Sequence, residues 1–351
     1  MIELDGSIGE GGGQVLRVSI ALSAILSKPI HIYNIRKKRS NPGLRPQHIS
    51  AVKSVAEACN GSVQGLHVGS TEIIFTPGYL EGGELRIDTG TAGSITLVLQ
   101  SLLPVLSFSS KPSSFHLIGG TNNPMAPPVE YLEKVLLPLL SKMGVRCGIE
   151  LVRRGFYPRG GGVVRGWVEP VHSLSPLEEV ERRDIGRVYG LSYTCRLPSH
   201  VSERMASSAE KSLSNKGFVA SIEREALMPN HPKCSTDPGA GIILVADGAY
   251  LGADRLGAPG LPAEEVGAGA AKQLIEEIES NAAIDRHAAD MLVIWVSLAE
   301  GRSRYSVSTL TSHTLTSVEI CRLLTGAEIE LAGRLGGPGI ITCRGIGFKR
   351  F

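Results

Sequence analysis

"QVLRVSIALSAILSKPIHIYNI", residues 14–35, decides the fold, because the chain repeats this order of elements. An apolar helix is followed by Ser-Lys-Pro and then by a strand in which apolar residues alternate. Residues 92–119 repeat the helix, the Ser-Lys-Pro and the strand, so that Pro29 and Pro112 lie 83 residues apart. A third helix and strand follow at residues 287–310. A recurring order of this kind indicates a fold built from repeated units.

Each copy continues with a polar loop, a second helix and two strands. The helices are apolar on most of their surface, which is typical of helices packed between sheets. We therefore predict an α+β fold of three repeated units, each with two helices on one face of a four-stranded sheet. Residues 183–279 break the period, and we predict a small α/β domain inserted before the third unit. Residues 1–182 and 280–351 then form the repeat-built domain, which we expect to carry any catalytic site.

Composition narrows the class of protein only in part. The formal net charge of the 351 residues is +2, so the overall charge indicates no partner. The six cysteines have no metal-ligand spacing, and no uncharged apolar run approaches the length of a membrane span. We expect a cytoplasmic protein with reduced cysteines, no membrane association and no stable protein partner.

The charge is distributed unevenly along the chain. No acidic residue occurs between Glu10 and Glu57, whereas "IRKKRSNPGLRPQH", residues 35–48, is strongly basic. Its Asn-Pro-Gly turn places these charges on a loop that leads into a helix, where anions bind favourably. We favour a phosphate-binding loop over a solvated basic face.

A second glycine-rich segment, "GEGGGQVLR", occupies residues 9–17. It is neither a P-loop nor a dinucleotide-binding fingerprint, because the required lysine and final glycine are absent. The backbone N–H groups of Gly11 to Gly13 lie where a helix begins, and Glu10 is suited to a divalent cation beside a phosphate. The alternative is a tight turn from strand to helix with no chemistry.

Two segments of the third unit carry candidate catalytic groups. His313 lies in "TLTSHTLTS", at the start of the second helix, in register with the basic loop of the first unit. A neutral imidazole there is a competent nucleophile toward phosphorus, but spacing alone favours a histidine that caps the helix. His287 and Asp290 share a helix face and are placed to contact a base or ribose.

Together these segments resemble the RNA 3'-terminal phosphate cyclase family. The strongest match is "RGFYPRGGGVV", residues 154–164, and "DGSIGEGGGQVLR", "NPGLRPQH", "AGSITLVLQSLLP", "NNPMAPP" and "LPSHVSER" follow the family order. The resemblance covers essentially the whole chain. It implies a repeat similar to the C-terminal domain of bacterial translation initiation factor three, with an insert where the period breaks.

The resemblance implies a three-step reaction that uses ATP, a divalent cation (Mg or Mn) and an RNA with a 3'-phosphate. A histidine takes AMP from ATP, passes it to the RNA 3'-phosphate, and the neighbouring 2'-hydroxyl then displaces AMP to leave a 2',3'-cyclic phosphate. By motif position the nucleophile is His313 and the metal contact is Glu10. The residues that match the nucleotide and phosphate sites are Gln100, His287, Ala288, Ala289, Asp290, Met291, Arg17, Arg36 and Arg39.

The chain departs from the family pattern at two positions, and two other functions remain as alternatives. Met291 stands where the family usually has glutamine, and Arg45 lies one residue earlier than in some relatives. The first alternative is a cyclase-like RNA-binding factor in ribosome assembly, without the nucleophilic histidine. The second is an enolpyruvyl-type transferase, which is also built from repeated units of helices on sheets.

Overall fold

A computed structural model describes residues 1–350, and it contains the three predicted units. The first unit consists of β1 (Ile2–Asp5), α1 (Gly13–Ile25), β2 (Ile30–Tyr33), α2 (Pro46–Ala58), β3 (Ser62–Gln64) and β4 (Ile73–Thr76). The second consists of β5 (Glu84–Asp88), α3 (Ile95–Ser107), β6 (Ser113–Gly119), α4 (Val129–Tyr131), the π-helix η1 (Leu132–Leu136), α5 (Leu137–Lys142), β7 (Arg146–Arg153) and β8 (Gly162–Glu169). The third consists of β9 (Glu178–Glu179), α8 (Arg286–Leu298), β14 (Arg302–Val307), α9 (Ser312–Thr325), β15 (Glu328–Gly333) and β16 (Gly339–Arg344).

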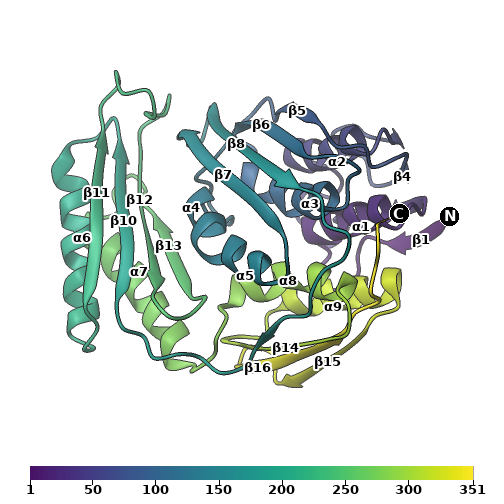
Figure 1. Ribbon diagram of the computed structural model, residues 1–351. Helices are drawn as coiled ribbons and strands as arrows, with labels where there is room; N and C mark the ends of the chain where they lie inside the picture. Colours follow the sequence, from purple (N-terminus) through teal and green to yellow (C-terminus); the bar gives the residue numbers. More distant parts are fainter. Residues whose placement is uncertain (351) are drawn as a thin grey trace.

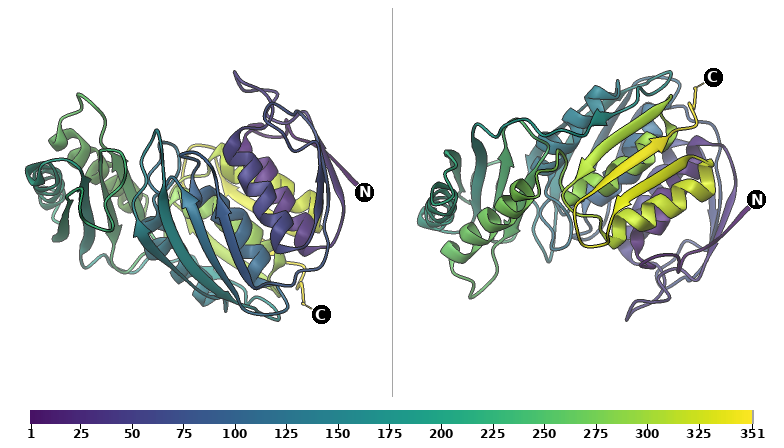
Figure 2. Two further views of the ribbon diagram at one scale, coloured as in Figure 1. Left: turned by 90° about the horizontal axis from the view of Figure 1, so that it is seen from above. Right: turned by 90° about the horizontal axis from the view of Figure 1, so that it is seen from below.

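The three sheets have the same topology. Their strand orders are β1-β2-β4-β3, β5-β6-β8-β7 and β9-β14-β16-β15. In each sheet the first two strands are parallel and the remaining pairs are antiparallel. The helices pack on one another, and the sheets lie outside them (Figures 1 and 2). The predicted α+β architecture of repeated helix-on-sheet units is confirmed.

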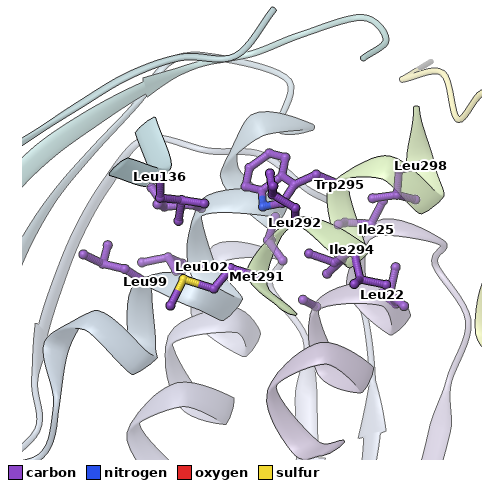
Figure 3. Packing of buried hydrophobic residues seen from close by; sticks show 14 of the residues in the cluster. Leu22, Ile25, Leu99, Leu102, Leu136, Met291, Leu292, Ile294, Trp295 and Leu298 are labelled. Carbon is purple, nitrogen blue, oxygen red and sulfur yellow. The ribbon is translucent and has the colours of Figure 1, made fainter. Parts of the chain in front are cut away.

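The core forms where the first helices of the units meet. Leu22 and Ile25 of α1, Leu99 and Leu102 of α3, and Leu292 of α8 are almost fully buried. Figure 3 shows the side chain of Met291 beside Leu99 and Leu102, with its thioether among hydrocarbon groups. Because these helices are enclosed on several sides, their sequences are apolar around most of the helix circumference.

The insert is a separate layer of sheet and helices with its own hydrophobic core. It consists of β10 (Val188–Cys195), α6 (Ser199–Ser214), β11 (Ala220–Leu227), β12 (Gly239–Ala246), β13 (Gly252–Leu256) and α7 (Ala263–Glu279), with strand order β11-β10-β12-β13. The insertion point lies between β9 and α8, because β9 pairs with β14 and completes the third sheet. Among residues 1–350, no helix combines the length and the apolar character needed to cross a membrane.

Several local features differ from the sequence-based expectation. In the first unit the strand that follows the second helix, expected from "SVQGLHV" at residues 62–68, ends at Gln64, because Gly65 turns the chain with a φ of +75°. The second helix of the second unit contains a π-helical turn, η1. Strand β13 was not predicted, and it forms the edge of the insert sheet nearest the site described below.

Candidate active site

A pocket of about 380 Å³ lies between the repeat-built domain and the insert. The repeat-built domain contributes side chains from α1, α3, α8 and α9 and from the loop at residues 123–127, and the insert contributes β13 and α7. The lining residues used below are Gln14, Arg17, Gln100, His287, Asp290, Met291 and His313. The structure thus brings together seven polar or polarisable groups from four helices.

The first polar element beside the pocket is the N-terminus of α1. Its N-cap residue, Gly12, offers no side chain to the N–H groups of the first turn. A Cβ at Gly12 would approach Glu10 Oε1 to 2.5 Å, and a Cβ at Gly13 would approach His48 Nε2 to 2.5 Å. The glycines therefore let these side chains close on the turn, and they leave backbone donors free for an anion.

His313 lies in the first turn of α9, but it is not the helix cap. Thr311 caps α9 by accepting a hydrogen bond from the backbone N–H of Thr314. The His313 Nδ1 lies 2.5 Å from Gln14 Oε1 and 3.0 Å from Glu10 Oε1. Both neighbouring atoms are acceptors, so the Nδ1 carries the proton, and in the neutral ring the Nε2 presents a lone pair. No hydrogen bond engages Nε2 within residues 1–350, and the ring lines the pocket.

The orientation of Gln14 follows from its second contact. Its Nε2 donates to Ser317 Oγ at 2.6 Å, so its oxygen faces the imidazole. Both partners of Gln14 belong to α9, and Gln14 lies 299 residues before His313. The contact joins the first and third units at the candidate nucleophile.

Charges around the pocket shift several pKa values. The hydrogen bond to Glu10 raises the pKa of His313, although burial opposes this. Burial of Glu10 opposes its ionisation, but the His313 hydrogen bond and the charges of His313, Arg39 and Arg17 lower its pKa overall. Burial raises the pKa of Asp290 to about 7 and lowers that of Arg17 to about 10. Groups perturbed in this way within one pocket are typical of functional sites.

Arg17, Gln100 and Asp290 lie about one turn into the first helices of the three units. Arg17 Nε donates to Gln100 Oε1 at 3.2 Å, and these two residues are 83 positions apart, which equals the repeat period. The charge of Asp290 acts on Arg17 in the opposite sense to burial. Equivalent positions of the repeat therefore converge on one side of the pocket.

The remaining predicted residues lie in different environments. Arg39 Nη2 lies 3.4 Å from Glu10 Oε2, at the glycine turn. Arg36 donates to the carbonyl oxygens of Asn41 and Gly43 and thereby shapes its own loop, outside the pocket lining. Ala288 and Ala289 are fully buried in helix packing and do not line the pocket. Met291 lines the pocket with a thioether that cannot donate a hydrogen bond.

The sequence interpretation missed several residues of the site. Gln14 occupies the position where a dinucleotide-binding fingerprint has its final glycine, and no sequence pattern indicated that its side chain contacts His313. His48 packs against the glycine turn, and burial and nearby arginines lower its pKa to about 3, so that it stays neutral. Asp254, Arg255 and Gln273 of the insert also line the pocket. The 83-residue offset identified in the sequence would have paired Arg17 with Gln100, but nothing in the sequence places the insert there.

Only part of a metal site is present among the protein groups. Within residues 1–350 no three His, Cys, Asp or Glu side chains are grouped as ligands. Glu10 is a single, mostly buried carboxylate at a helix N-terminus. Mg²⁺ is commonly held by one or two carboxylates together with substrate phosphates, and Glu10 fits that type of site.

The family model and similar named proteins indicate the same family. The family model for RNA 3'-terminal phosphate cyclase matches residues 8–331. A protein named RNA 3'-terminal phosphate cyclase from Desulfurococcus amylolyticus is 48% identical over 99% of both chains. Proteins of the same name from Ignicoccus hospitalis and Pyrococcus furiosus are 46% and 43% identical, over 100% and 97% of both chains. The chain therefore belongs to the RNA 3'-terminal phosphate cyclase family.

Proposed function

We propose that this protein converts an RNA 3'-phosphate to a 2',3'-cyclic phosphate with consumption of ATP, through AMP linked to His313. The observation that carries the proposal is the contact of His313 Nδ1 with two acceptors, which leaves Nε2 free in the pocket. Family membership supports the overall reaction, and the local geometry supports the identity of the nucleophile.

In the first step His313 Nε2 attacks the α-phosphorus of ATP. A phosphorus–nitrogen bond forms, the bond to the bridging oxygen of the β-phosphate breaks, and pyrophosphate leaves. The imidazole then carries a positive charge, which Glu10 stabilises from 3.0 Å. This carboxylate makes the histidine a better nucleophile and holds its ring in place.

In the second step an oxygen of the RNA 3'-phosphate attacks the phosphorus of the histidine-linked AMP. The phosphorus–nitrogen bond breaks, and an RNA–adenylate anhydride forms. In the third step the 2'-hydroxyl attacks the terminal RNA phosphorus, loses its proton to solvent, and AMP leaves. Both steps need phosphate charges to be neutralised, and Arg17 and Arg39 are guanidinium groups whose charges act on this site.

The nucleotide and cation would be held by residues of several elements. Gln100, His287, Asp290 and Met291 line the pocket, and a nucleoside would lie against them. The free N–H groups of α1 would face its phosphates. Glu10 would hold a divalent cation, which supplies neutralisation of phosphate charge when bound.

The alternatives from the sequence are less well supported. A binding factor for ribosome assembly has no use for a histidine oriented by two acceptors beside a pocket whose titratable groups have shifted pKa values. An enolpyruvyl transferase is not the family that the chain belongs to. No observation favours either function.

The test is incubation of the protein with α-labelled ATP and Mg²⁺ or Mn²⁺. We expect an acid-labile, alkali-stable label on the wild-type protein and none on His313→Ala. His67→Ala is the matched control, because His67 is exposed and lies on a loop of the first unit. Equal labelling of wild type and His313→Ala would refute the proposed nucleophile, and failure of a 3'-phosphorylated RNA to become phosphatase-resistant would refute the reaction.

A further inference from the structure

Two loops from different domains meet beside the pocket. One is the turn between β7 and β8, residues 154–161, and the other is the loop between β11 and β12, residues 228–238. The N–H of Arg154 donates to Lys233 O at 3.0 Å. The Arg159 Nε donates to Asp237 Oδ1 at 2.8 Å, and within the insert Arg196 Nε donates to Ser235 O at 2.8 Å. These contacts make one continuous surface, which we call the hairpin surface and define as Tyr157, Arg159, Arg196, His231 and Lys233.

The hairpin surface is basic. Arg159, Arg196, His231 and Lys233 are exposed. The one acidic residue in the two loops is Asp237, which is buried and already paired with Arg159. The Lys233 ammonium has no ion-pair partner within residues 1–350. A surface with this excess of cations attracts a polyanion.

The same surface carries an exposed aromatic ring. Tyr157 is 74% exposed, although a tyrosine ring usually covers apolar area in a fold. Met228, on the neighbouring loop, is 58% exposed. Aromatic rings beside cations are the groups on which successive bases of single-stranded nucleic acids stack.

The surface has a rigid base. Arg154 is 2% exposed and forms ion pairs with Glu130 of the second unit and Glu225 of the insert. Its guanidinium carbon lies 3.8 Å from the ring centroid of Tyr193. The relative position of the two loops is therefore fixed before any ligand binds, which reduces the entropy cost of binding.

The hairpin surface is connected directly to the pocket rim. The N–H groups of Thr121 and Asn122 donate to Gly155 O at 2.9 and 3.3 Å, and the next residue, Asn123, lines the pocket. Tyr157 is two residues from Gly155, so the hairpin surface adjoins the loop that carries Asn123 to the pocket. Two arginines of the basic loop at residues 35–48 already have partners within the protein. Arg36 donates hydrogen bonds to its own loop, and Arg39 pairs with Glu10.

We propose that the hairpin surface binds the single-stranded RNA segment immediately upstream of the 3'-phosphate. Lys233 and Arg196 contact its phosphates, and the ring of Tyr157 stacks on a base. The insert thus forms half of the RNA path. This inference rests on the proposed function only for the position of the RNA end in the pocket.

The experiment measures binding rather than turnover. A 12-nucleotide RNA with a 5'-fluorophore and a 3'-phosphate is titrated with the full chain, and fluorescence anisotropy gives Kd at several salt concentrations. The variants are Tyr157→Ala and Lys233→Gln. The matched control is Lys211→Gln, which removes an exposed charge from α6 of the same insert.

We expect Tyr157→Ala to weaken binding roughly tenfold, as the loss of one stacked base does. Lys233→Gln should reduce the slope of log Kd against log salt by about 0.7, which corresponds to one lost phosphate contact. Lys211→Gln should leave both quantities unchanged. Unchanged Kd and slope in both hairpin variants, or no binding of the RNA by wild type, would overturn the inference.

The two proposals fail in different ways. If wild type is not labelled by ATP but the hairpin variants weaken RNA binding, the proposed chemistry is wrong and the RNA path stands. If labelling depends on His313 but RNA affinity depends only on the loop at residues 36–45, the chemistry stands and the RNA path is wrong.

Discussion

Replacing Arg154 by methionine tests the buried ion pairs that connect the insert to the second unit. The Arg154 Nη1 lies 2.6 Å from Glu130 Oε1, and the two side chains are 2% and 6% exposed. No hydrogen bond of standard geometry is formed by the Glu130 oxygens within residues 1–350, so Arg154 is the charge that compensates this carboxylate. Glu225 is 26% exposed and partly solvated, so its pairing contributes less.

The expected loss follows from the burial of Glu130. Methionine keeps the aliphatic volume of Arg154 but leaves a buried carboxylate without a cation, which costs about 3–5 kcal/mol. The double variant Arg154→Met/Glu130→Gln leaves only the partly exposed Glu225 without its cation and no fully buried charge uncompensated, and we expect it to recover more than half of that loss. The surface pair Arg146 with Glu169 is 74% and 41% exposed, and Arg146→Met should cost about 0–1 kcal/mol.

The assay is urea unfolding followed by circular dichroism, with the free energy of unfolding taken from midpoint and slope. Two results would refute the reasoning. One is an Arg154→Met variant within about 1 kcal/mol of wild type. The other is a double variant no more stable than Arg154→Met, because the cost would then come from lost packing and not from a stranded charge.

Three further predictions concern the pocket. The rate of protein labelling by ATP should fall as the pH is lowered, because protonation removes the Nε2 lone pair of His313. The midpoint of this fall should lie above pH 6.5, because the pKa of His313 is raised, and Glu10→Gln should move the midpoint to lower pH. Arg17→Lys keeps a charge but loses the planar fork, and kcat/KM for RNA cyclisation, measured under steady-state conditions, should fall about 10- to 100-fold. Asp285→Ala removes the N-cap of α8 and strands the hydroxyl of Tyr131, so urea unfolding should show a loss of about 3 kcal/mol or more.

Much of the fold could be predicted because each copy of the repeat has a recognisable local sequence pattern. Each unit has an apolar helix, a strand and a turn of its own, and a unit with one exposed apolar face must pack against its copies. The short strand β9 was missed because two residues carry no periodic signal, and its pairing with β14 depends on tertiary contact. Strand β13 was missed for a similar reason, since Gly252–Leu256 mixes glycine and charged residues with apolar ones.

The site could be predicted only in part. Family motifs and helix position singled out His313, Glu10 and Arg17, and the structure places these residues close together. The contact of Gln14 with His313 could not be predicted, because it spans 299 residues and joins two helices whose packing the sequence does not specify. The sequence could not predict that Asp254 lines the pocket either, because the position of Asp254 depends on how the insert packs against the second unit.

The location of the pocket follows from the repeat itself. The first helices α1, α3 and α8 are equivalent by sequence, so their N-terminal turns reach the same end of the core, and the residues one turn further in face one another. Side chains at these positions are not needed for apolar packing on one another. They differ in kind, with a cation at Arg17, an amide at Gln100 and a carboxyl at Asp290. Three copies of one helix therefore supply three different polar groups to a single pocket, while α9 adds His313. A symmetric scaffold thus acquires an asymmetric site through a few substitutions at one end of its helices, and the apolar remainder of each helix keeps the units packed.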